Sequence, residues 1–282
     1  MPVTVQPPLD ETSEARGREA GRDGSQAGAT VRFEWGAAGA RDVTSGCAAV
    51  VVVDVLSFTT TAAIAASFAT EVLPCVSDED ASRLAASTGA QLAVPRHEAD
   101  ADHPWSLSPA SITGAVPGGR LVLPSPNGSA ISAELRVSGM PVLAACLRNA
   151  GAVASWLVDR DLGRPRAPVA VIAAGERWAD GSLRPAIEDL FAAGLVLDEL
   201  VRAGGNASAE TSAAVASVLG LPPARLADLV RASTSGTELR VAGYAEDVEI
   251  AVAIGTDDVV PVMWGDSLGF QADRRRRAEG GP

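Results

Sequence analysis

Asp54 is the residue whose position in the sequence most strongly suggests chemistry. It follows the apolar run "AAVVVV" and precedes a hydroxyl-rich turn in "VVVDVLSFTTT", residues 51–61. A carboxylate beside a buried valine run costs several kcal/mol unless charge or hydrogen bonds compensate it. We therefore expect Asp54 to bind a ligand or a metal ion.

Polar residues also follow other runs that we predict to be strands. Ligands of open parallel sheets bind outside the carboxyl ends of the strands, so we expect these groups to converge. The groups are Asp54 with Ser57, Thr59, Thr60 and Thr61; Ser125, Pro126, Asn127, Gly128 and Ser129 after "RLVL"; Arg148 and Asn149 after "VLAA"; and "AGERWADGS", which leads to Glu188 and Asp189.

Each of these groups also has a structural interpretation. The hydroxyls at 59–61 could cap a helix, and the "NG" pair at 127–128 could form a turn. The two acids at 188–189 could complement a helix dipole. Arg148 could be a surface charge and Asn149 a helix cap. The sequence leaves these alternatives open.

The nucleophiles of the familiar covalent phosphatases do not fit this sequence. Cys75 and Cys146 are not followed by a C-x₅-R loop. Asp54 lacks a second aspartate two residues later, where Leu56 stands. We find neither a P-loop nor a G-x-G-x-x-G segment after a strand. Metal-assisted attack by water is the mechanism that remains.

The segment "RHEADADH", residues 96–103, could itself form a metal site. It contains His97 and His103, with Glu98, Asp100 and Asp102 between them. Clusters of histidines and carboxylates can bind metal ions, but such a stretch is more often a solvated acidic loop. We favour the loop.

The elements that must position these residues are predicted from two patterns in the sequence. Short β-branched runs are typical of strands, and longer Ala/Leu segments with helical spacing are typical of helices. Strands buried on both faces lack in/out alternation, which is typical of a mainly parallel sheet under helices. We predict a three-layer α/β/α fold with a mainly parallel or mixed sheet. Strands are expected at 48–56, 71–76, 91–94, 120–123, 140–145, 168–174 and 259–263, and helices at 61–69, 78–87, 129–135 and 149–158.

Two later segments of the chain are predicted to be helical. A helix should begin near Pro185, bury a stripe and end at Gly204–Gly205; the stripe is Ile187, Leu190, Phe191, Gly194, Leu197 and Val201. Residues 207–245 read as two short helices separated by a "STSGTELR" turn, and they could form a small helical subdomain.

Composition sets limits on location and partners. The 282 residues carry a net charge of −12, which argues against a nucleic-acid surface. Scattered Cys47, Cys75 and Cys146 fit a reduced, cytoplasmic protein, and we find no signal peptide and no membrane-spanning run. We expect disordered tails at 1–29 and 271–282, the second containing Arg274–Arg277, around one α/β domain at 30–270.

Five of these segments together resemble the 2-phosphosulfolactate phosphatase family. They are "VVVDVLSFTTT", "LPSPNGSAIS", "CLRNAGAVA", "VIAAGERWADGSLRPAIEDLFAAG" and "AEDVEIAVAIGTDDVVPVM". The resemblance implies Mg²⁺-dependent hydrolysis of a phosphate ester on a three-carbon sulfonated acid, in coenzyme M biosynthesis. It places Asp54, Asn127, Asn149, Glu188 and Asp189 in the polar signature of the family, and Asp247 at a late acidic position.

The chain departs from that family in two places. The family motif usually reads D-V-L-R, and here Ser57 replaces the arginine. A G-E-R triplet is also missing near "AVPRHEA". A hydroxyl cannot replace a bidentate guanidinium, so the substrate could be less anionic, or the activity reduced. Arg96, Arg148 or Arg177 could substitute.

The sequence therefore supports a Mg²⁺-dependent phosphoric monoester hydrolase acting on a small phosphorylated acid. Asp54 and Glu188 would bind the metal, and Asp189 would complete the catalytic set by orienting water. Substrate contacts are assigned to Ser57, Thr59, Thr60, Ser125, Asn127, Gly128, Ser129, Arg148 and Asn149. The alternatives are a non-catalytic relative that binds an anionic metabolite, and a metal-independent lyase or isomerase. A homo-oligomer is compatible with the sequence.

Overall fold

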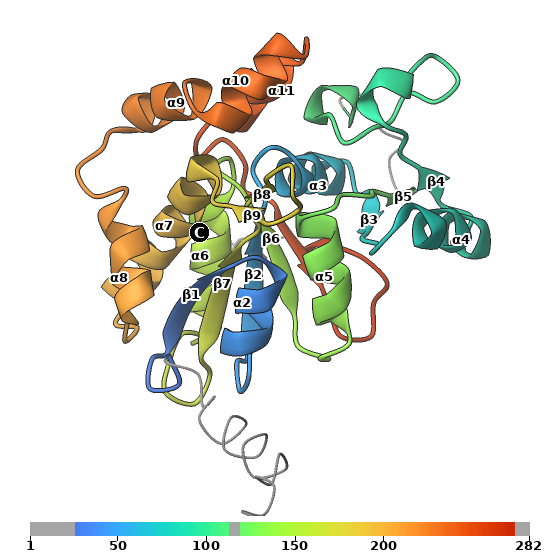
Figure 1. The fold of residues 1–282 in the computed structure, drawn as a ribbon. Coiled ribbons are helices and arrows are strands. Elements are labelled where there is room, and N and C mark those ends of the chain that lie inside the picture. Colours follow the sequence, from blue (N-terminus) through green and yellow to red (C-terminus); the bar gives the residue numbers. More distant parts are fainter. Residues whose placement is uncertain (1–25, 113–118, 274–282) are drawn as a thin grey trace, which may run out of the picture.

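The computed structural model describes residues 26–112 and 119–273, and its main sheet confirms the three-layer prediction (Figure 1). Its strands lie in the order β1, β7, β2, β6, β10, β11. The first four of these are parallel, whereas β10 and β11 are antiparallel to their neighbours. The strands are β1 (Val31–Trp35), β2 (Ala49–Val53), β6 (Val142–Ala145), β7 (Val169–Ala173), β10 (Val260–Met263) and β11 (Gln271–Asp273).

Strand β2 is buried along its whole length because helices cover both faces of the sheet. Val51 and Val53 pack into the core under α6 (Ala150–Asp159) and α7 (Ile187–Arg202). Val50 and Val52 pack into the opposite core, which lies under α2 (Gly36–Val43), α3 (Phe58–Ser67) and α5 (Gly128–Arg136). This double burial explains the continuous apolar run. The predicted stripe of α7 is buried at Phe191 and Leu197, whereas Ile187 is exposed.

Three of the predicted strands form a separate small parallel sheet. Its order is β3 (Glu71–Leu73), β5 (Arg120–Val122), β4 (Gln91–Leu92), and α4 (Asp78–Thr88) packs beside it. The 3₁₀ turns η1 (Arg96–Glu98) and η2 (Pro109–Ile112) follow β4 in the chain. The "SPNGS" loop therefore leaves a strand of the small sheet, although it reaches the same region as the end of β2.

Residues 207–251 are more helical than expected. They form α8 (Ala209–Ala216), α9 (Pro223–Arg231), α10 (Thr234–Val241) and α11 (Ala245–Ala251). The predicted "STSGTELR" turn is wrong, because it forms α10. Ser233 caps this helix by accepting a hydrogen bond from the Gly236 N–H at 3.0 Å. Helices α9–α11 lie above the same end of the main sheet as the hairpin β8 (Glu176–Arg177) and β9 (Leu183–Arg184) (Figure 1).

The predicted tails lie largely outside the described residues. Gln26 nevertheless belongs to the folded domain: it is buried, and it exchanges hydrogen bonds with the Phe33 backbone at 2.9 and 3.0 Å. At the other end, residues 271–273 form β11 and pair with β10. The folded domain thus includes a few residues beyond 30–270 at each end; Arg274–Arg277 lie outside the described residues. Among residues 26–112 and 119–273, no helix has the length and apolarity needed to cross a membrane.

Candidate active site

Asp54 follows β2 directly, and its side chain is held between the first turns of two helices. Its Oδ2 accepts hydrogen bonds from the Gly128 N–H at 2.7 Å and the Ser125 hydroxyl at 3.4 Å. Its Oδ1 accepts from the Phe58 N–H at 3.3 Å. The carboxylate is only 5% exposed. It makes no ion pair among the described residues, so these dipoles are its main compensation for burial.

Gly128 has to be a glycine for this contact to form. A Cβ built on it would lie 2.6 Å from both Cβ and Oδ2 of Asp54, and 2.8 Å from Cδ1 of Phe58. Real Cβ atoms do not approach other atoms so closely. The glycine in "SPNGS" therefore allows the α5 backbone to reach the carboxylate.

Asp189 and Glu188 lie at the start of α7, beside the ends of β2 and β7. Asp189 accepts hydrogen bonds from the Val55 N–H at 2.7 Å and the Gly175 N–H at 2.9 Å, which joins the two strand ends. Glu188 is 1% exposed, and its Oε2 has no hydrogen-bond partner among the described residues. A buried unpaired carboxylate oxygen is costly. It indicates a place for a cation, a water molecule or a proton.

A further acid, Glu176, belongs to this cluster, and the sequence did not single it out. It lies on β8 and accepts a hydrogen bond from Asn127 Nδ2 at 3.0 Å. With Asn127 and Arg177 it lines a cavity of about 220 Å³. One feature of the sequence could have identified Glu176. It lies three residues after the buried strand β7, and Asp54 likewise follows the buried strand β2.

The pKa shifts show how strongly these carboxylates influence one another. Burial raises the pKa of Asp54, although the Gly128 and Phe58 N–H groups oppose the shift. The pKa of Asp189 lies well above its usual value, first through burial and then through the charges of Asp54 and Glu188. Burial and the same two charges raise the pKa of Glu176 to about 7. When ionised together, these carboxylates repel one another.

Two guanidinium groups lie next to the cluster. Arg96 donates from Nη2 to the Ser57 hydroxyl at 2.6 Å, and its charge opposes the rise that burial causes in the pKa of Asp54. Arg177 donates to the Pro126 carbonyl at 2.9 Å and to Asn127 Oδ1 at 3.3 Å. In a chain of net charge −12, these arginines place positive charge beside the acids.

Comparison with known proteins supports the resemblance seen in the sequence. Residues 39–265 match the family model described as 2-phosphosulpholactate phosphatase. The chain belongs to this family. It is also 28% identical, over 157 residues, to the "Probable 2-phosphosulfolactate phosphatase" of Deinococcus radiodurans. That match covers 55% of this chain and 61% of the relative, so the chain spans about three-fifths of the length of this curated family member.

Three hydroxyls that we predicted to bind substrate donate hydrogen bonds to backbone carbonyls. Thr59 Oγ1 donates to the Asp54 carbonyl at 2.7 Å, and Thr60 Oγ1 donates to the Val55 carbonyl at 2.7 Å. Ser129 Oγ donates to the Leu123 carbonyl at 2.8 Å. All three side chains are fully buried. Their contacts favour the structural interpretation in this family member.

Arg148 and Asn149 are also occupied by other parts of the chain. Arg148 donates two hydrogen bonds of 2.8 Å to Asp257 and one of 2.8 Å to the Ile250 carbonyl. Asn149 is fully buried; its Oδ1 accepts from the Cys146 N–H, and its Nδ2 donates to the Val259 carbonyl at 3.1 Å. These contacts give both residues a structural role, although Asn149 matches the family signature.

The structure does bring together Asp54, Glu188, Asp189, Ser57, Ser125, Asn127 and Gly128. Gly128, one of the predicted substrate contacts, donates its backbone N–H to Asp54. Ser57 is almost fully buried and accepts its hydrogen bond from Arg96. Asn127 joins Glu176 to Arg177 across the small cavity. Asn127 is also one of the residues that line this cavity.

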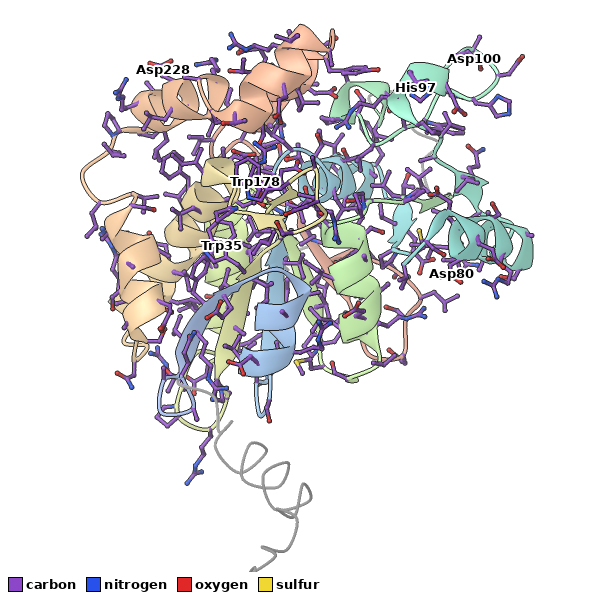
Figure 2. All side chains as sticks on the ribbon, in the orientation of Figure 1. Trp35, Asp80, His97, Asp100, Trp178 and Asp228 are labelled. Atoms are coloured by element: carbon purple, nitrogen blue, oxygen red, sulfur yellow. The ribbon has the colours of Figure 1, made fainter. Side chains whose placement is uncertain are left out.

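Apart from Arg96, the histidine segment lies away from the carboxylates. Figure 2 shows His97 and Asp100 at the outer edge of the molecule. The His97 side chain is 77% exposed, and Asp100 Oδ1 accepts from the backbone N–H groups of Asp102 and His103 at 2.9 and 2.8 Å. The contacts favour the solvated acidic loop. Across the described part of the chain, no three His, Cys, Asp or Glu side chains are grouped so that they could hold a metal ion.

The cysteines do not provide a nucleophile. Burial raises the pKa of the Cys75 and Cys146 thiols to about 11 each. Since the thiolate is the reactive form, both thiols are unreactive near neutral pH. This agrees with the missing C-x₅-R loop.

Proposed function

We propose that this chain is a phosphoric monoester hydrolase that uses Mg²⁺ to release phosphate from a small phosphorylated acid. Family membership supports the reaction class, and the printed name of the Deinococcus relative suggests 2-phosphosulfolactate as the first substrate to test. The observation that carries the proposal is the unpaired buried oxygen of Glu188 within a cluster of mutually repelling carboxylates.

The residues fit a Mg²⁺ ion held by Asp54 and Glu188. Mg²⁺ binds carboxylate oxygens and usually keeps several waters, so one or two protein carboxylates suffice. A group of three ligands is therefore not required. Glu188 Oε2 is free, and Asp54 Oδ1 accepts only one hydrogen bond, of 3.3 Å, among the described residues. When bound, the ion would neutralise charge on a phosphoryl oxygen in a loose transition state.

The remaining residues of the cluster would position the reactants. Asp189 keeps the ends of β2 and β7 together through Val55 and Gly175. Its role in orienting water stays a prediction, because both its oxygens already accept hydrogen bonds. Glu176 faces the cavity beside Asn127 and is the better placed acceptor for a proton of the attacking water. The water oxygen bonds to phosphorus, the ester P–O bond breaks, and the proton passes to the departing alkoxide.

The alternative is a relative that binds an anionic metabolite without turnover. One observation favours it: the Gly128 and Phe58 N–H groups, which could have held phosphate, bond to Asp54 instead. A lyase or isomerase would form product without releasing phosphate. A role in coenzyme M biosynthesis and a cytoplasmic location are further parts of the proposal, the second supported by three free cysteines.

Phosphate release from a panel of small phosphorylated acids, with Mg²⁺ and with chelator, tests the proposal. We expect release that the chelator abolishes and that Asp54→Asn and Glu188→Gln lower by about 100-fold or more. Arg83→Gln is the control, because Arg83 forms exposed surface pairs with Glu79 and Asp80. Full turnover by Asp54→Asn would contradict the assignment. No turnover, with a phosphorylated acid still raising the melting temperature, would favour the binding protein.

A further inference from the structure

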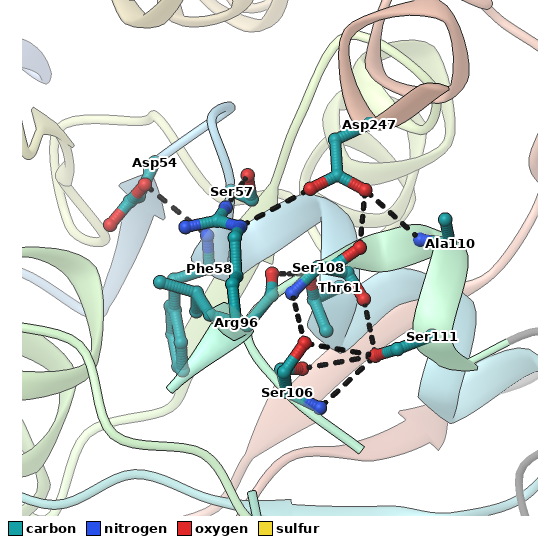
Figure 3. Close-up of polar contacts among 11 residues, drawn as sticks. Asp54, Ser57, Phe58, Thr61, Arg96, Ser106, Ser108, Ala110, Ser111 and Asp247 are labelled. Carbon is teal, nitrogen blue, oxygen red and sulfur yellow. Dashed lines mark hydrogen bonds and ion pairs between the residues drawn. The ribbon is translucent and has the colours of Figure 1, made fainter. Parts of the chain in front are cut away.

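Arg96 occupies an unusual position between two aspartates (Figure 3). From η1 it donates through Nη2 to the Ser57 hydroxyl at 2.6 Å, and through Nε to Asp247 Oδ2 at 3.2 Å. Its charge acts on Asp54. The Arg96 side chain is 18% exposed, whereas that of Asp247 is 1% exposed. The guanidinium therefore lies at the boundary between the carboxylate cluster and solvent.

Asp247 is held in place by several donors. Its Oδ1 accepts a hydrogen bond from the Ser108 hydroxyl and one from the Ala110 N–H at 3.4 Å. Its Oδ2 accepts from Arg96. Asp247 lies on α11, 151 residues after Arg96 in the chain. Tyr244, just before α11, places its ring 5.6 Å from Arg96 Cζ. The C-terminal helices thus fix the direction of this guanidinium.

Open space adjoins Arg96. A groove of about 660 Å³ is lined by Arg96, His97, Pro124 and Tyr244, and also by the acids Asp78 and Glu98. Arg96 Nη1 makes no hydrogen bond to any described residue. A ligand in the groove would therefore find a guanidinium edge already oriented, beside the acidic cluster.

Other arginines in this chain show what a purely structural role looks like. Arg32 is buried and donates to the carbonyls of Ala29, Val43 and Ser45, and to that of Ala27. Arg148 is likewise fully engaged by Asp257 and Ile250. Arg96 differs because its ordered guanidinium keeps donors free at an open groove. A structural ion pair alone does not explain this geometry.

We propose that Arg96 is a specificity-determining residue that binds a second acidic group of the substrate, a carboxylate or sulfonate, while the phosphoryl group lies at the carboxylate cluster. Asp247 is the positioning residue that holds Arg96 in this orientation. The inference rests on the proposed function, since it names the feature of the substrate that the same site selects. A guanidinium suits this task because its planar donors match an oxyanion.

A pair of esters that differ only in the second acid tests the role of Arg96. These are phospholactate and isopropyl phosphate, in which a methyl group replaces the carboxylate. A charge-assisted hydrogen bond implies that wild type prefers phospholactate in kcat/KM by about 10- to 100-fold. Arg96→Gln should reduce this preference to about threefold or less, and Arg83→Gln should retain it. A preference that survives in Arg96→Gln, or equal losses for both esters, would overturn the role.

The proposed function can fail separately from this inference. If wild type releases phosphate from neither ester, the hydrolase assignment is wrong. The preference is then measured by calorimetry, as the ratio of the dissociation constants of the two esters. Calorimetry can be used in that case because neither ester is hydrolysed during the titration. Phospholactate preferred by wild type and Arg83→Gln, but not by Arg96→Gln, would still support Arg96. No preference in wild type would overturn it.

The positioning role of Asp247 needs its own measurement. Asp247→Asn should lower the preference for phospholactate by raising its KM, with the constants for isopropyl phosphate changed by less than about threefold. A merely structural role would instead lower kcat/KM for both esters in parallel, and that result would refute positioning. If Asp247→Asn does not fold, Ser108→Ala removes one of its donors and keeps the charge. It should shift the same ratio in the same direction, and an unchanged ratio would refute positioning.

Discussion

Replacing Gly128 by alanine should damage the carboxylate cluster more than any other single methyl group added to a helix start. The new Cβ would lie 2.6 Å from Asp54 Oδ2 and 2.8 Å from the fully buried ring of Phe58. Asp54 cannot simply move away, because its Oδ2 accepts the 2.7 Å hydrogen bond from the Gly128 N–H itself. Either the helix must shift or the carboxylate must leave its donors.

The expected loss of stability combines two costs. Forcing a methyl group into a packed site typically costs about 1–3 kcal/mol. Loss of the hydrogen bond to a charged, buried group adds about 1.5–3 kcal/mol. The two costs share one displacement, so we expect a total of about 3–4 kcal/mol rather than the full sum. Urea unfolding followed by circular dichroism measures it, and phosphate release from the same preparation should fall by about tenfold or more because Asp54 is displaced.

Gly151 provides a matched control. It lies in the first turn of α6, is exposed, and a Cβ added to it would meet no atom within 4 Å. Gly151→Ala should leave stability unchanged or raise it by up to about 1 kcal/mol, through helix propensity. If Gly128→Ala unfolds within about 1 kcal/mol of wild type and keeps its activity, the close packing of α5 on Asp54 is refuted.

Glu176 should make the stability of the metal-free protein depend on pH. Its folded pKa of about 7 exceeds the ordinary 4.5, so its contribution to the free energy of unfolding is complete below pH 4.5 and is lost as the pH rises through 7. The loss is at most about 3 kcal/mol, and about half of this once the partial exposure of Glu176 is allowed for. Urea unfolding of Glu176→Gln should lack the loss, and an identical pH profile would contradict it. Arg148→Gln should lower the free energy of unfolding by about 1–3 kcal/mol, because Asp257 loses its partner, but it should change kcat/KM by less than about threefold. Loss of activity with unchanged stability would instead support the predicted substrate contact of Arg148. Cys75→Ala should keep phosphate release. In the folded wild-type protein, the Cys75 thiol should resist alkylation at neutral pH because burial raises its pKa to about 11. Rapid alkylation would show that the thiol is not buried.

Much of the main sheet could be predicted from the sequence because double burial leaves a plain signal. The valine run ending at Asp54 and the run at 168–174 became β2 and β7, shortened by one to three residues at their ends. The small sheet could not be assigned in the same way. Its strands are only two or three residues long, and nothing in so short a run says which sheet it joins. The fold was therefore predictable as a class, but not as two sheets.

The candidate site was predictable where the backbone dictates it. Asp54 had to be near the ends of neighbouring parallel strands, and Glu188 and Asp189 meet it there. Side chains whose partners lie far along the chain were not predictable. Arg148 is engaged by Asp257, 109 residues later, and no local pattern distinguishes this from binding a ligand. The hydroxyl of Thr59 bonds to the carbonyl of Asp54, which depends on turn geometry rather than residue type.

The small side chain of Ser57 and the placement of Arg96 belong together. The Ser57 hydroxyl accepts the 2.6 Å hydrogen bond from Arg96, 39 residues away in the chain, so the small side chain is what allows that guanidinium to approach the end of β2. An arginine at position 57 would compete for the same space and add a second positive charge beside it. Because Asp247 already neutralises part of the Arg96 charge and orients it, the positive charge in this chain is supplied from η1 and fixed by α11. Under the proposed function, selectivity for the substrate would be set by η1 and α11, which lie outside the main sheet, while the carboxylates proposed to carry the chemistry lie at the ends of β2 and β7.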